Sequence, residues 1–463
     1  MRINDTIAAL STPKGKGGIA VIRISGADAV EVAGRVFLPA CGKPLGEIEH
    51  SRAVYGRIYE NAERAGAPID DGIATVFYAP RSFSGEDTVE ISCHGGLLVS
   101  EAVLSALLSA GARHAEAGEF TRRAFVNGKL GLSEAEALSN LLEAKSHSQM
   151  KLARSGLDGH LEKKCGEIYS SLKEILSSLY AKIDYPDEDL ADMGSGEMRK
   201  RVGDALEEVK KTASTYKSGR AIAEGIKTVI CGRPNVGKSS LYNRIVGREA
   251  AIVTDIEGTT RDILEETASL GGVTLRLCDT AGLRSSGDRV ERIGIERAYT
   301  KIDEAELILA VFDGSCGLTD EDEELIAYLF DKKERVVAVV NKSELAAKID
   351  KQRLVSAFGE IIEISAELED GIEPLAAVAE SRFLDKSIDI ENDAVVFGAR
   401  QNAALTKTAE LLCGALEILA CEGEIDAAAF AVETAMAALC ELDGRQVGED
   451  IVSQIFSKFC VGK

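Results

Sequence analysis

The 463-residue sequence predicts a three-part fold: an α+β N-terminal domain, an all-α helical domain made of two segments, and an α/β domain inserted between those segments. Three observations lead to this prediction. Short apolar runs separated by turn residues fill positions 1–129, and apolar residues at helical spacing follow them. Residues 225–384 then alternate β-rich runs with helical stretches before the helical pattern returns.

The first 129 residues are predicted to form one α+β domain. Two stretches have helical spacing, 27–36 and 97–110. Four apolar runs predict β-strands: 19–24, 54–59, 73–78 and 88–92.

A long amphipathic helix is predicted next, because apolar residues recur every three or four positions from Leu161 to Ile183. It is expected to end before Pro186, since proline disfavours a helical conformation in the residue before it. Further helices are predicted over 196–218, 403–420, 425–442 and 449–458. The two segments of this helical domain are predicted to be 130–224 and 385–463.

The inserted domain, predicted over 225–384, has the alternation that is typical of a parallel α/β sheet. Its β-rich runs are 227–231, 274–279, 307–313, 336–341 and 361–365.

Composition limits the function classes. Asp and Glu total 76 against 54 Lys and Arg, a net charge of −22, so a whole-protein electrostatic grip on nucleic acid is excluded. Contact with RNA would need a local patch of basic side chains or a partner protein. The ten cysteines include no C-x-x-C pair, which favours reduced thiols in a cytoplasmic protein. No apolar stretch approaches the roughly 20 residues of a membrane span, and a secretory signal is not expected.

A phosphate-binding motif, G-x-x-x-x-G-K-S, occupies Gly232–Ser239 between a predicted strand and a predicted helix. Its glycines let backbone N–H groups curl around a β-phosphate, while Lys238 reaches the β and γ oxygens. The Ser239 hydroxyl is placed to bind Mg²⁺. A glycine-rich turn without function would not need this order of strand, loop and helix.

Further motifs follow in the order expected of a nucleotide switch. Asp279–Gly282 ends a predicted strand, where a carboxylate would lie near the metal, and Thr260 can reach Mg²⁺ from the opposite side. Asn341-Lys-Ser-Glu344 ends another strand, where a base would lie, and Ser365-Ala366 ends the last. Five motifs in this order predict a P-loop (Ras-like) GTPase domain.

This region resembles the translation-factor-like P-loop GTPases, with two departures. The family's base-reading motif is Asn-Lys-x-Asp, and Glu344 here is one methylene longer, so guanine preference is expected with weaker affinity as a possible consequence. Leu283 stands where Ras-like enzymes carry a water-orienting Gln, and a hydrophobic residue cannot polarise water. Another group must take that role.

The whole chain resembles the MnmE (TrmE) family of tRNA modification GTPases. The resemblance spans essentially all 463 residues and reproduces the inserted-domain layout. The matching segments are 5–9, 17–26, 82–87, 118–125, 183–188, 254–262 and the C-terminal Cys460-Val-Gly-Lys463.

The resemblance implies a reaction and partners. Such proteins form homodimers through their N-terminal domains and heterotetramers with an FAD-binding partner (MnmG, or GidA). They modify carbon 5 of wobble uridine 34 in tRNA, contacted largely through the partner. A folate such as 5-formyl-tetrahydrofolate supplies the one-carbon unit, and glycine or ammonium supplies the amino part. The product is a carboxymethylaminomethyl or aminomethyl group.

The resemblance also implies site residues. Folate would be bound by Arg23, Glu90, Lys129 and Lys463. K⁺ would replace an arginine finger, held by Asn235, Thr254, Ile256 and Thr259, while Glu291 orients water and Lys238 binds the transferred phosphate. Mg²⁺ is assigned to Ser239 and Thr260. The implied GTP-binding residues are Asn235, Val236, Gly237, Lys238, Ser239, Ser240, Thr254, Asp255, Ile256, Glu257, Gly258, Thr259, Thr260, Asp279, Thr280, Ala281, Gly282, Asn341, Lys342 and Glu344.

Alternatives remain at two points. Cys460 is either a reactive thiol or a residue buried in packing. The phosphate-loop motifs fit a GTP-dependent assembly switch for ribosomal subunits as well as a modification enzyme. The N-terminal folate set and the C-terminal tail favour the enzyme, and so does the acidic balance, which argues against unaided RNA binding. A folate-dependent transferase acting alone would leave the GTPase domain unexplained.

Overall fold

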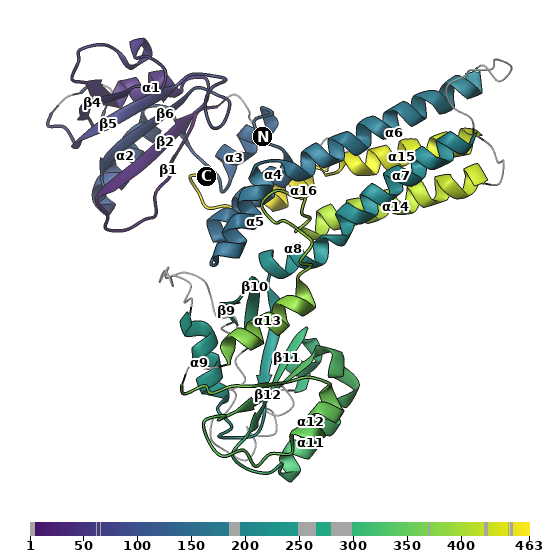
Figure 1. Ribbon diagram of the computed structural model, residues 1–463. Coiled ribbons are helices and arrows are strands. Elements are labelled where there is room, and N and C mark those ends of the chain that lie inside the picture. The colour runs from purple at the N-terminus through teal and green to yellow at the C-terminus, as the bar shows by residue number, and fades with distance from the viewer. Residues whose placement is uncertain are drawn as a thin grey trace. The chain divides into compact units, whose positions relative to one another are not determined.

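The computed structural model describes residues 5–61, 63–64, 66–184, 195–248, 265–278, 299–368, 371–420, 425–442, 444 and 448–463. The chain forms two compact units (Figure 1). The N-terminal unit combines residues 1–139 with residues 440–463, and the central unit comprises residues 140–439.

A seven-stranded sheet organises the N-terminal unit, with strand order β3-β4-β5-β6-β2-β1-β7. All neighbouring pairs are antiparallel except β1 and β7, which are parallel. The strands are β1 (Ile7–Leu10), β2 (Ile19–Ser25), β3 (Phe37–Pro39), β4 (Ala53–Ile58), β5 (Asp70–Phe77), β6 (Thr88–His94) and β7 (Arg113–His114). The helices are α1 (Ala29–Val36), α2 (Leu97–Ser109), α3 (Glu119–Val126), α4 (Leu132–Glu143), which runs on into the central unit, and α16 (Glu449–Phe456).

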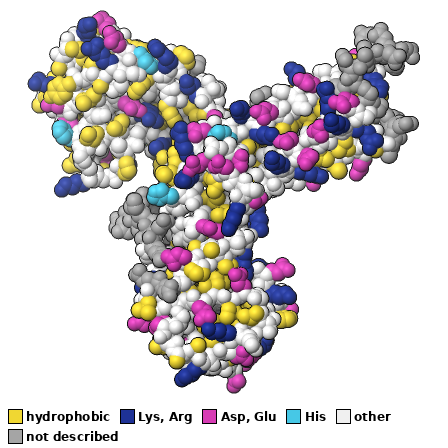
Figure 2. All heavy atoms as spheres, in the orientation of Figure 1, with side chains coloured by type: hydrophobic (Ala, Val, Ile, Leu, Met, Phe, Trp, Pro, Cys, Tyr) yellow, Lys and Arg dark blue, Asp and Glu magenta, His cyan; other side chains and the backbone are white. Residues whose placement is uncertain are grey.

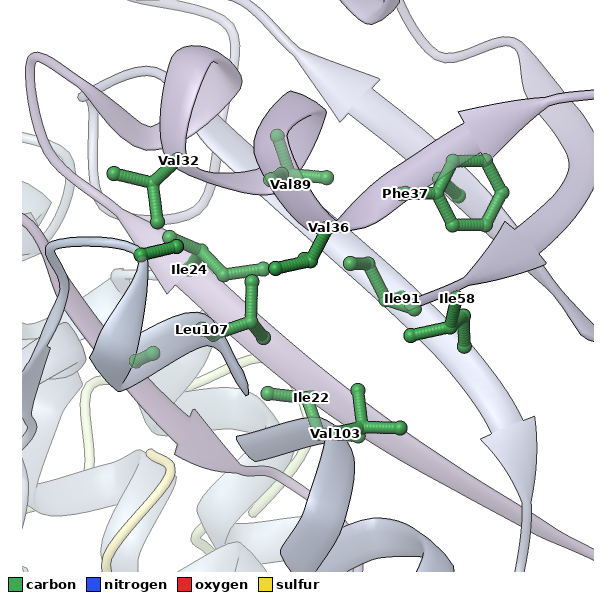
Figure 3. Close-up of a cluster of buried hydrophobic side chains, with 14 of the residues drawn as sticks. Ile22, Ile24, Val32, Val36, Phe37, Ile58, Val89, Ile91, Val103 and Leu107 are labelled. Carbon is green, nitrogen blue, oxygen red and sulfur yellow. The ribbon is translucent and has the colours of Figure 1, made fainter. Parts of the chain in front are cut away.

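The core of this sheet lies on the face covered by α1 and α2. Ile22 and Ile24 from β2 and Ile91 from β6 alternate with less buried residues, so their side chains reach the same face (Figure 3). Val36 from α1 and Leu107 from α2 pack against them, and all five are fully buried. Each such side chain contributes about 1.5–3 kcal/mol when it leaves water. The apolar runs that predict these strands therefore supply the core.

A buried ionic network lies beside β1. Arg123 on α3 is 1% exposed and pairs with Asp5 (2.7 Å), Glu119 (3.0 Å) and Glu86 (3.2 Å). Arg113 also pairs with Glu119, at 2.7 Å. Burial alone would raise the pKa of Glu119, but the hydrogen bonds from Arg113 and Arg123 outweigh it and lower that pKa. The carboxylate stays ionised because the arginines hold it.

Arg123→Met is expected to lower the free energy of unfolding by about 3–5 kcal/mol, because it leaves buried carboxylates unpaired. Arg52→Met is the matched control, since its ion pair with Glu49 is exposed and contributes at most about 1 kcal/mol. Urea unfolding at pH 7 measures both. Because the pKa of Glu119 is lower in the folded chain, the wild type should also lose stability as the pH falls below about 4.3. Equal losses in the two variants would contradict this account.

The C-terminal segment, residues 448–463, packs against the N-terminal residues of the same unit. Phe456 and Phe459 cluster with Phe125. Gly118 has φ 66°, and a Cβ there would lie 2.2 Å from the Phe456 carbonyl oxygen, so only glycine fits. The chain end then reaches β1, because the Ser11 hydroxyl donates to the Gly462 carbonyl at 3.0 Å.

Long helices from both sides of the second sheet in sequence form one part of the central unit (Figure 1). α7 contacts both α6 and α14, and the Tyr180 hydroxyl donates to Glu433 at 3.1 Å, joining α6 to α15. Only Thr215 separates α7 from α8, which begins at Tyr216. The helices are α5 (His147–Leu157), α6 (His160–Asp184), α7 (Ser195–Ser214), α8 (Tyr216–Ala223), α14 (Ala399–Ala420) and α15 (Ile425–Cys440). No helix in the described ranges is long and apolar enough to cross a membrane.

A six-stranded sheet forms the rest of the central unit, in the order β13-β12-β11-β8-β10-β9. Neighbours are parallel except for β9, which is antiparallel to β10. The strands are β8 (Ile226–Cys231), β9 (Glu265–Leu270), β10 (Val273–Cys278), β11 (Leu307–Asp313), β12 (Val336–Asn341) and β13 (Ile361–Glu363). The helices are α9 (Lys238–Arg248), α11 (Asp320–Leu329), α12 (Lys351–Phe358) and α13 (Ile372–Phe383). The predicted fold class is confirmed.

Candidate GTP-binding site

The phosphate loop joins β8 to α9. Gly232 and Gly237 have φ 144° and 99°, and Asn235 between them has φ 63°. A Cβ on Gly232 would lie 2.3 Å from the Val311 carbonyl oxygen, and one on Gly237 would lie 2.0 Å from the Asn341 amide nitrogen. Both positions therefore require glycine, and Asn tolerates the left-handed conformation better than most residues.

Lys238 begins α9 and holds the loop together. Its Nζ donates to the carbonyl oxygens of Gly232 and Arg233, both at 2.8 Å. No acidic residue occupies the first turn of α9, so the positive end of the helix dipole is not neutralised there. Ser239 and Ser240 follow and are exposed. The loop, the ammonium and the helix N-terminus together fit a bound phosphate.

The position of β8 in the sheet explains why the site lies here. Its neighbours are β11 on one side and β10 on the other. The strand order therefore reverses at β8: β9 and β10 lie on one side of it, and β11, β12 and β13 lie on the other. Ligands of open α/β sheets bind beside the carboxyl ends of strands at such a point. The predicted motifs at Gly232, Asn341 and Ser365 follow β8, end β12 and follow β13.

The base-reading loop is tied to the phosphate loop. The buried Asn341 amide donates to the Val236 carbonyl at 2.8 Å and accepts from the Ala366 N–H at 3.0 Å. Lys342 has φ 66°, and its ammonium lies 2.6 Å from Asp313 Oδ2. Glu344 is exposed. One amide side chain thus holds three segments of chain in register.

Asp313 ends β11 and is the partner that sequence reasoning missed. Its other oxygen, Oδ1, accepts from the Ser315 hydroxyl at 2.6 Å. Burial alone would raise the pKa of Asp313, but Lys342 and Ser315 outweigh burial and lower it. The sequence signal that could have identified Asp313 is its position as an acidic residue at the end of a continuous apolar run.

Part of the predicted site falls outside the described residues. This holds for the predicted GTP, Mg²⁺ and K⁺ contacts in 254–260 (Thr254, Asp255, Ile256, Glu257, Gly258, Thr259 and Thr260), for Asp279, Thr280, Ala281 and Gly282, and for Glu291. Their assignments stay predictions.

A second predicted set lies in the N-terminal unit. Arg23 and Glu90 are direct partners across β2 and β6, and Arg23 Nη2 lies 2.7 Å from Glu90 Oε1. The Arg23 guanidinium also stands over the rings of Phe83 (5.0 Å) and Phe120 (5.7 Å). These two aromatic residues were not predicted, because nothing in their local sequence indicates that they lie beside β2.

The two predicted lysines lie on separate segments of the N-terminal unit. Lys129 donates to the Pro80 carbonyl at 3.0 Å, on the loop that also carries Phe83. The tail ending in Lys463 packs against Leu10, next to Ala9, the cross-strand partner of Arg23. Within the part of the chain that the structure describes, Arg23 forms its ion pair with Glu90, whereas Lys129 bonds to Pro80.

Cys460 is exposed, so the alternative in which it is buried in packing is wrong. Its carbonyl oxygen accepts from the backbone N–H of Lys463 at 3.3 Å.

Family models match nearly the whole chain. The model of the GTP-binding protein TrmE N-terminus matches residues 6–129, and that of the MnmE helical domain matches residues 132–460. The chain belongs to the MnmE family of tRNA modification GTPases.

Full-length relatives agree with the family models. A tRNA modification GTPase MnmE of Clostridioides difficile is 38% identical, with all of both chains covered. One from Caldicellulosiruptor saccharolyticus is 39% identical and one from Symbiobacterium thermophilum is 41% identical, each over 99% of both chains. The similarity to MnmE proteins thus includes the N-terminal unit as well as the phosphate loop.

Proposed function

We propose that this chain is a K⁺-activated, cytoplasmic GTPase that modifies tRNA wobble uridine 34. With an FAD-binding partner of the MnmG (GidA) type, it would add a carboxymethylaminomethyl or aminomethyl group at carbon 5, using a folate one-carbon unit. The observation that carries this proposal is the full-length similarity to proteins named tRNA modification GTPase. The phosphate loop and the Arg23–Glu90 pair support it.

GTP would bind with its phosphates in the loop 232–239. Backbone N–H groups of the loop and the Lys238 ammonium would neutralise the β and γ oxygens. Ser239 and Thr260 would hold Mg²⁺, which supplies charge stabilisation between the β- and γ-phosphates. The Ser239 hydroxyl, exposed in the first turn of α9, fits that role. Asn341 and Glu344 would read guanine, and Glu291 would orient the attacking water.

K⁺ would bind beside the same loop, held by Asn235, Thr254, Ile256 and Thr259. Asn235 fits this role because its side chain is exposed in a left-handed turn and offers a neutral amide oxygen. A bound monovalent cation supplies positive charge where an arginine finger would otherwise act.

Folate would bind at the Arg23–Glu90 pair. Arg23 and the two lysines, Lys129 and Lys463, suit the glutamate carboxylates of the ligand, while Glu90 suits the N–H groups of the pterin ring. Phe83, which is partly exposed beside Arg23, adds an aromatic surface for a flat ring. Cys460 is an exposed thiol on the same tail as Lys463.

Arg23→Ala is expected to weaken 5-formyl-tetrahydrofolate binding by at least about tenfold, because it removes a charged partner that is worth about 1.5–3 kcal/mol. GTP hydrolysis should stay near normal. Equilibrium binding and phosphate release measure the two activities separately. Arg57→Ala on β4 is the matched control, because its side chain is exposed and lies 3.8 Å from Asp71. Equal loss of folate binding and GTP hydrolysis in Arg23→Ala would contradict the two-site assignment.

Partners follow from the family and from charge. We propose a homodimer through the N-terminal unit, and a heterotetramer with the FAD-binding protein. Basic and acidic side chains lie interspersed over the face that Figure 2 shows, and the net charge is −22. A chain with this balance would contact tRNA largely through its partner. Light scattering without nucleotide is expected to give a dimer, and a strict monomer at micromolar concentration would contradict it.

The modification is tested by mass spectrometry of wobble uridine in tRNA from cells with and without this protein. Loss of the modified nucleoside supports the proposal. Unchanged nucleosides together with a defect in ribosomal subunits would instead favour the assembly switch.

A further inference from the structure

Arg233 belongs to the phosphate loop, but its side chain contacts a different element. Its Nε donates to Asp322 Oδ2 at 3.2 Å, and its Nη2 lies 2.8 Å from the sulfur of Cys316. Asp322 lies in the first turn of α11, and Cys316 precedes that helix. The guanidinium therefore joins the loop after β8 to the segment after β11.

The Asp322 carboxylate, which accepts the hydrogen bond from Arg233, is held in place by Thr319 as well. Asp322 Oδ2 also accepts from the Thr319 N–H (3.0 Å) and from the Thr319 hydroxyl (2.9 Å). The Asp322 N–H donates in return to the Thr319 hydroxyl oxygen at 3.4 Å, which completes a capping box at the start of α11. The Asp322 side chain is 3% exposed, and its Oδ1 has no hydrogen-bond partner within the described ranges. Burial of a carboxylate is costly unless a cation pairs with it, and Arg233 is its cation.

The backbone of the same residue holds the phosphate-binding lysine. The Arg233 carbonyl accepts from Lys238 Nζ at 2.8 Å, so the side chain anchors α11 while the carbonyl orients the ammonium. Arg233 Nη2 also lies 3.9 Å from Asp313 Oδ2, which bonds to Lys342 of the base-reading loop. Asp322, Arg233 and Lys238 form one continuous chain of contacts.

We propose that Arg233 is a positioning residue for GTP hydrolysis, which fixes Lys238 through its own carbonyl while Asp322 anchors its side chain. The inference rests on the proposed binding of GTP in this loop. Charge on the β–γ bridging oxygen grows in the transition state, so a displaced ammonium costs more there than in the bound ground state. Loss of the anchor should therefore lower kcat more than it raises KM.

The test compares Arg233→Gln, Asp322→Asn and the double variant Arg233→Gln/Asp322→Asn in the full-length protein. We expect each to lower kcat for GTP at least about tenfold, since small misplacements of catalytic groups have effects of that size. KM should change by less than about threefold. The double variant should be no slower than the slower single variant, because both substitutions break the same contact. The double variant also leaves no unpaired buried charge, so it remains informative if a single variant fails to fold.

Arg353→Gln is the matched control. It breaks an exposed ion pair of 2.8 Å with Glu323, the neighbour of Asp322 on α11, and should leave kcat unchanged. A double variant that is folded by circular dichroism and has kcat within twofold of the wild type would overturn the proposal. A double variant whose loss of kcat equals the product of the two single-variant losses would also overturn the proposal, because the two residues would then act independently. A wild-type protein without GTPase activity would instead refute the proposed function.

Discussion

Replacing Lys238 with alanine is expected to reduce GTP hydrolysis by about 10³-fold or more and to weaken GTP binding. The ammonium lies at the centre of the loop, bonded to the carbonyls of Gly232 and Arg233, and would face the β and γ oxygens of bound GTP. Stabilisation of charge on the transferred phosphoryl group dominates catalysis in enzymes of this class, and one cation there contributes roughly 10³–10⁵-fold. Phosphate release and fluorescent-nucleotide binding measure the two losses.

Lys227→Ala is a suitable control, because Lys227 is exposed on β8, the strand that leads into the loop. It should hydrolyse GTP at the wild-type rate. Hydrolysis by Lys238→Ala within tenfold of the wild type would show that the nucleotide binds elsewhere. Melting curves of the two variants check that Lys238→Ala stays folded without the two loop hydrogen bonds of Lys238.

The phosphate loop could be predicted because its chemistry is local. Within eight residues, Gly232–Ser239 specify a turn that only glycine allows, an ammonium and a helix start, and the structure brings these together. The parallel strands β8, β11 and β12 could be predicted for a related reason. Strands that are buried on both faces read as continuous apolar runs, and every residue of β11 and β12 is buried.

Other elements carry too little local signal. The strand β9, Glu265–Leu270, contains two glutamates and a serine, and it forms because it pairs with β10 at the edge of the sheet. The two-residue strand β7 exists only through its parallel pairing with β1. Tertiary pairing decides both cases, and strand propensity depends strongly on such context.

Contacts between distant segments also escape a sequence pattern. Arg23 lies beside Glu90 because β2 pairs with β6, and the register of that pairing depends on the whole sheet. The bond from Lys342 to Asp313 and the bond from Arg233 to Asp322 likewise follow from strand order rather than from spacing. Motifs indicate which side chains carry the chemistry, whereas topology determines which side chains support them.

GTP hydrolysis is expected to be much faster in K⁺ than in Na⁺, by roughly 10³-fold if the ion replaces an arginine finger in full. Leu283 follows the Asp279–Gly282 motif where a water-orienting Gln would otherwise stand, so hydrolysis must rely on other groups. The family resemblance implies that K⁺ supplies the positive charge of an arginine finger. Asn235 offers a neutral amide oxygen from an exposed turn of the phosphate loop. A cage of such oxygens selects an ion by its size. Rates of phosphate release at equal ionic strength in KCl and NaCl measure the effect.

Two substitutions at Asn235 distinguish the loss of its amide oxygen as a ligand from a distortion of the loop backbone. Its φ of 63° strains most residues, so Asn235→Ala would confuse lost coordination with a distorted loop. Asn235→Gly accepts that conformation and removes only the amide, and it should abolish the difference between K⁺ and Na⁺. Asn235→Asp keeps an oxygen at the same place and should preserve a K⁺ preference. If the wild type hydrolyses GTP equally fast in both salts, the cation mechanism is wrong, even though the phosphate loop and Lys238 would keep their roles.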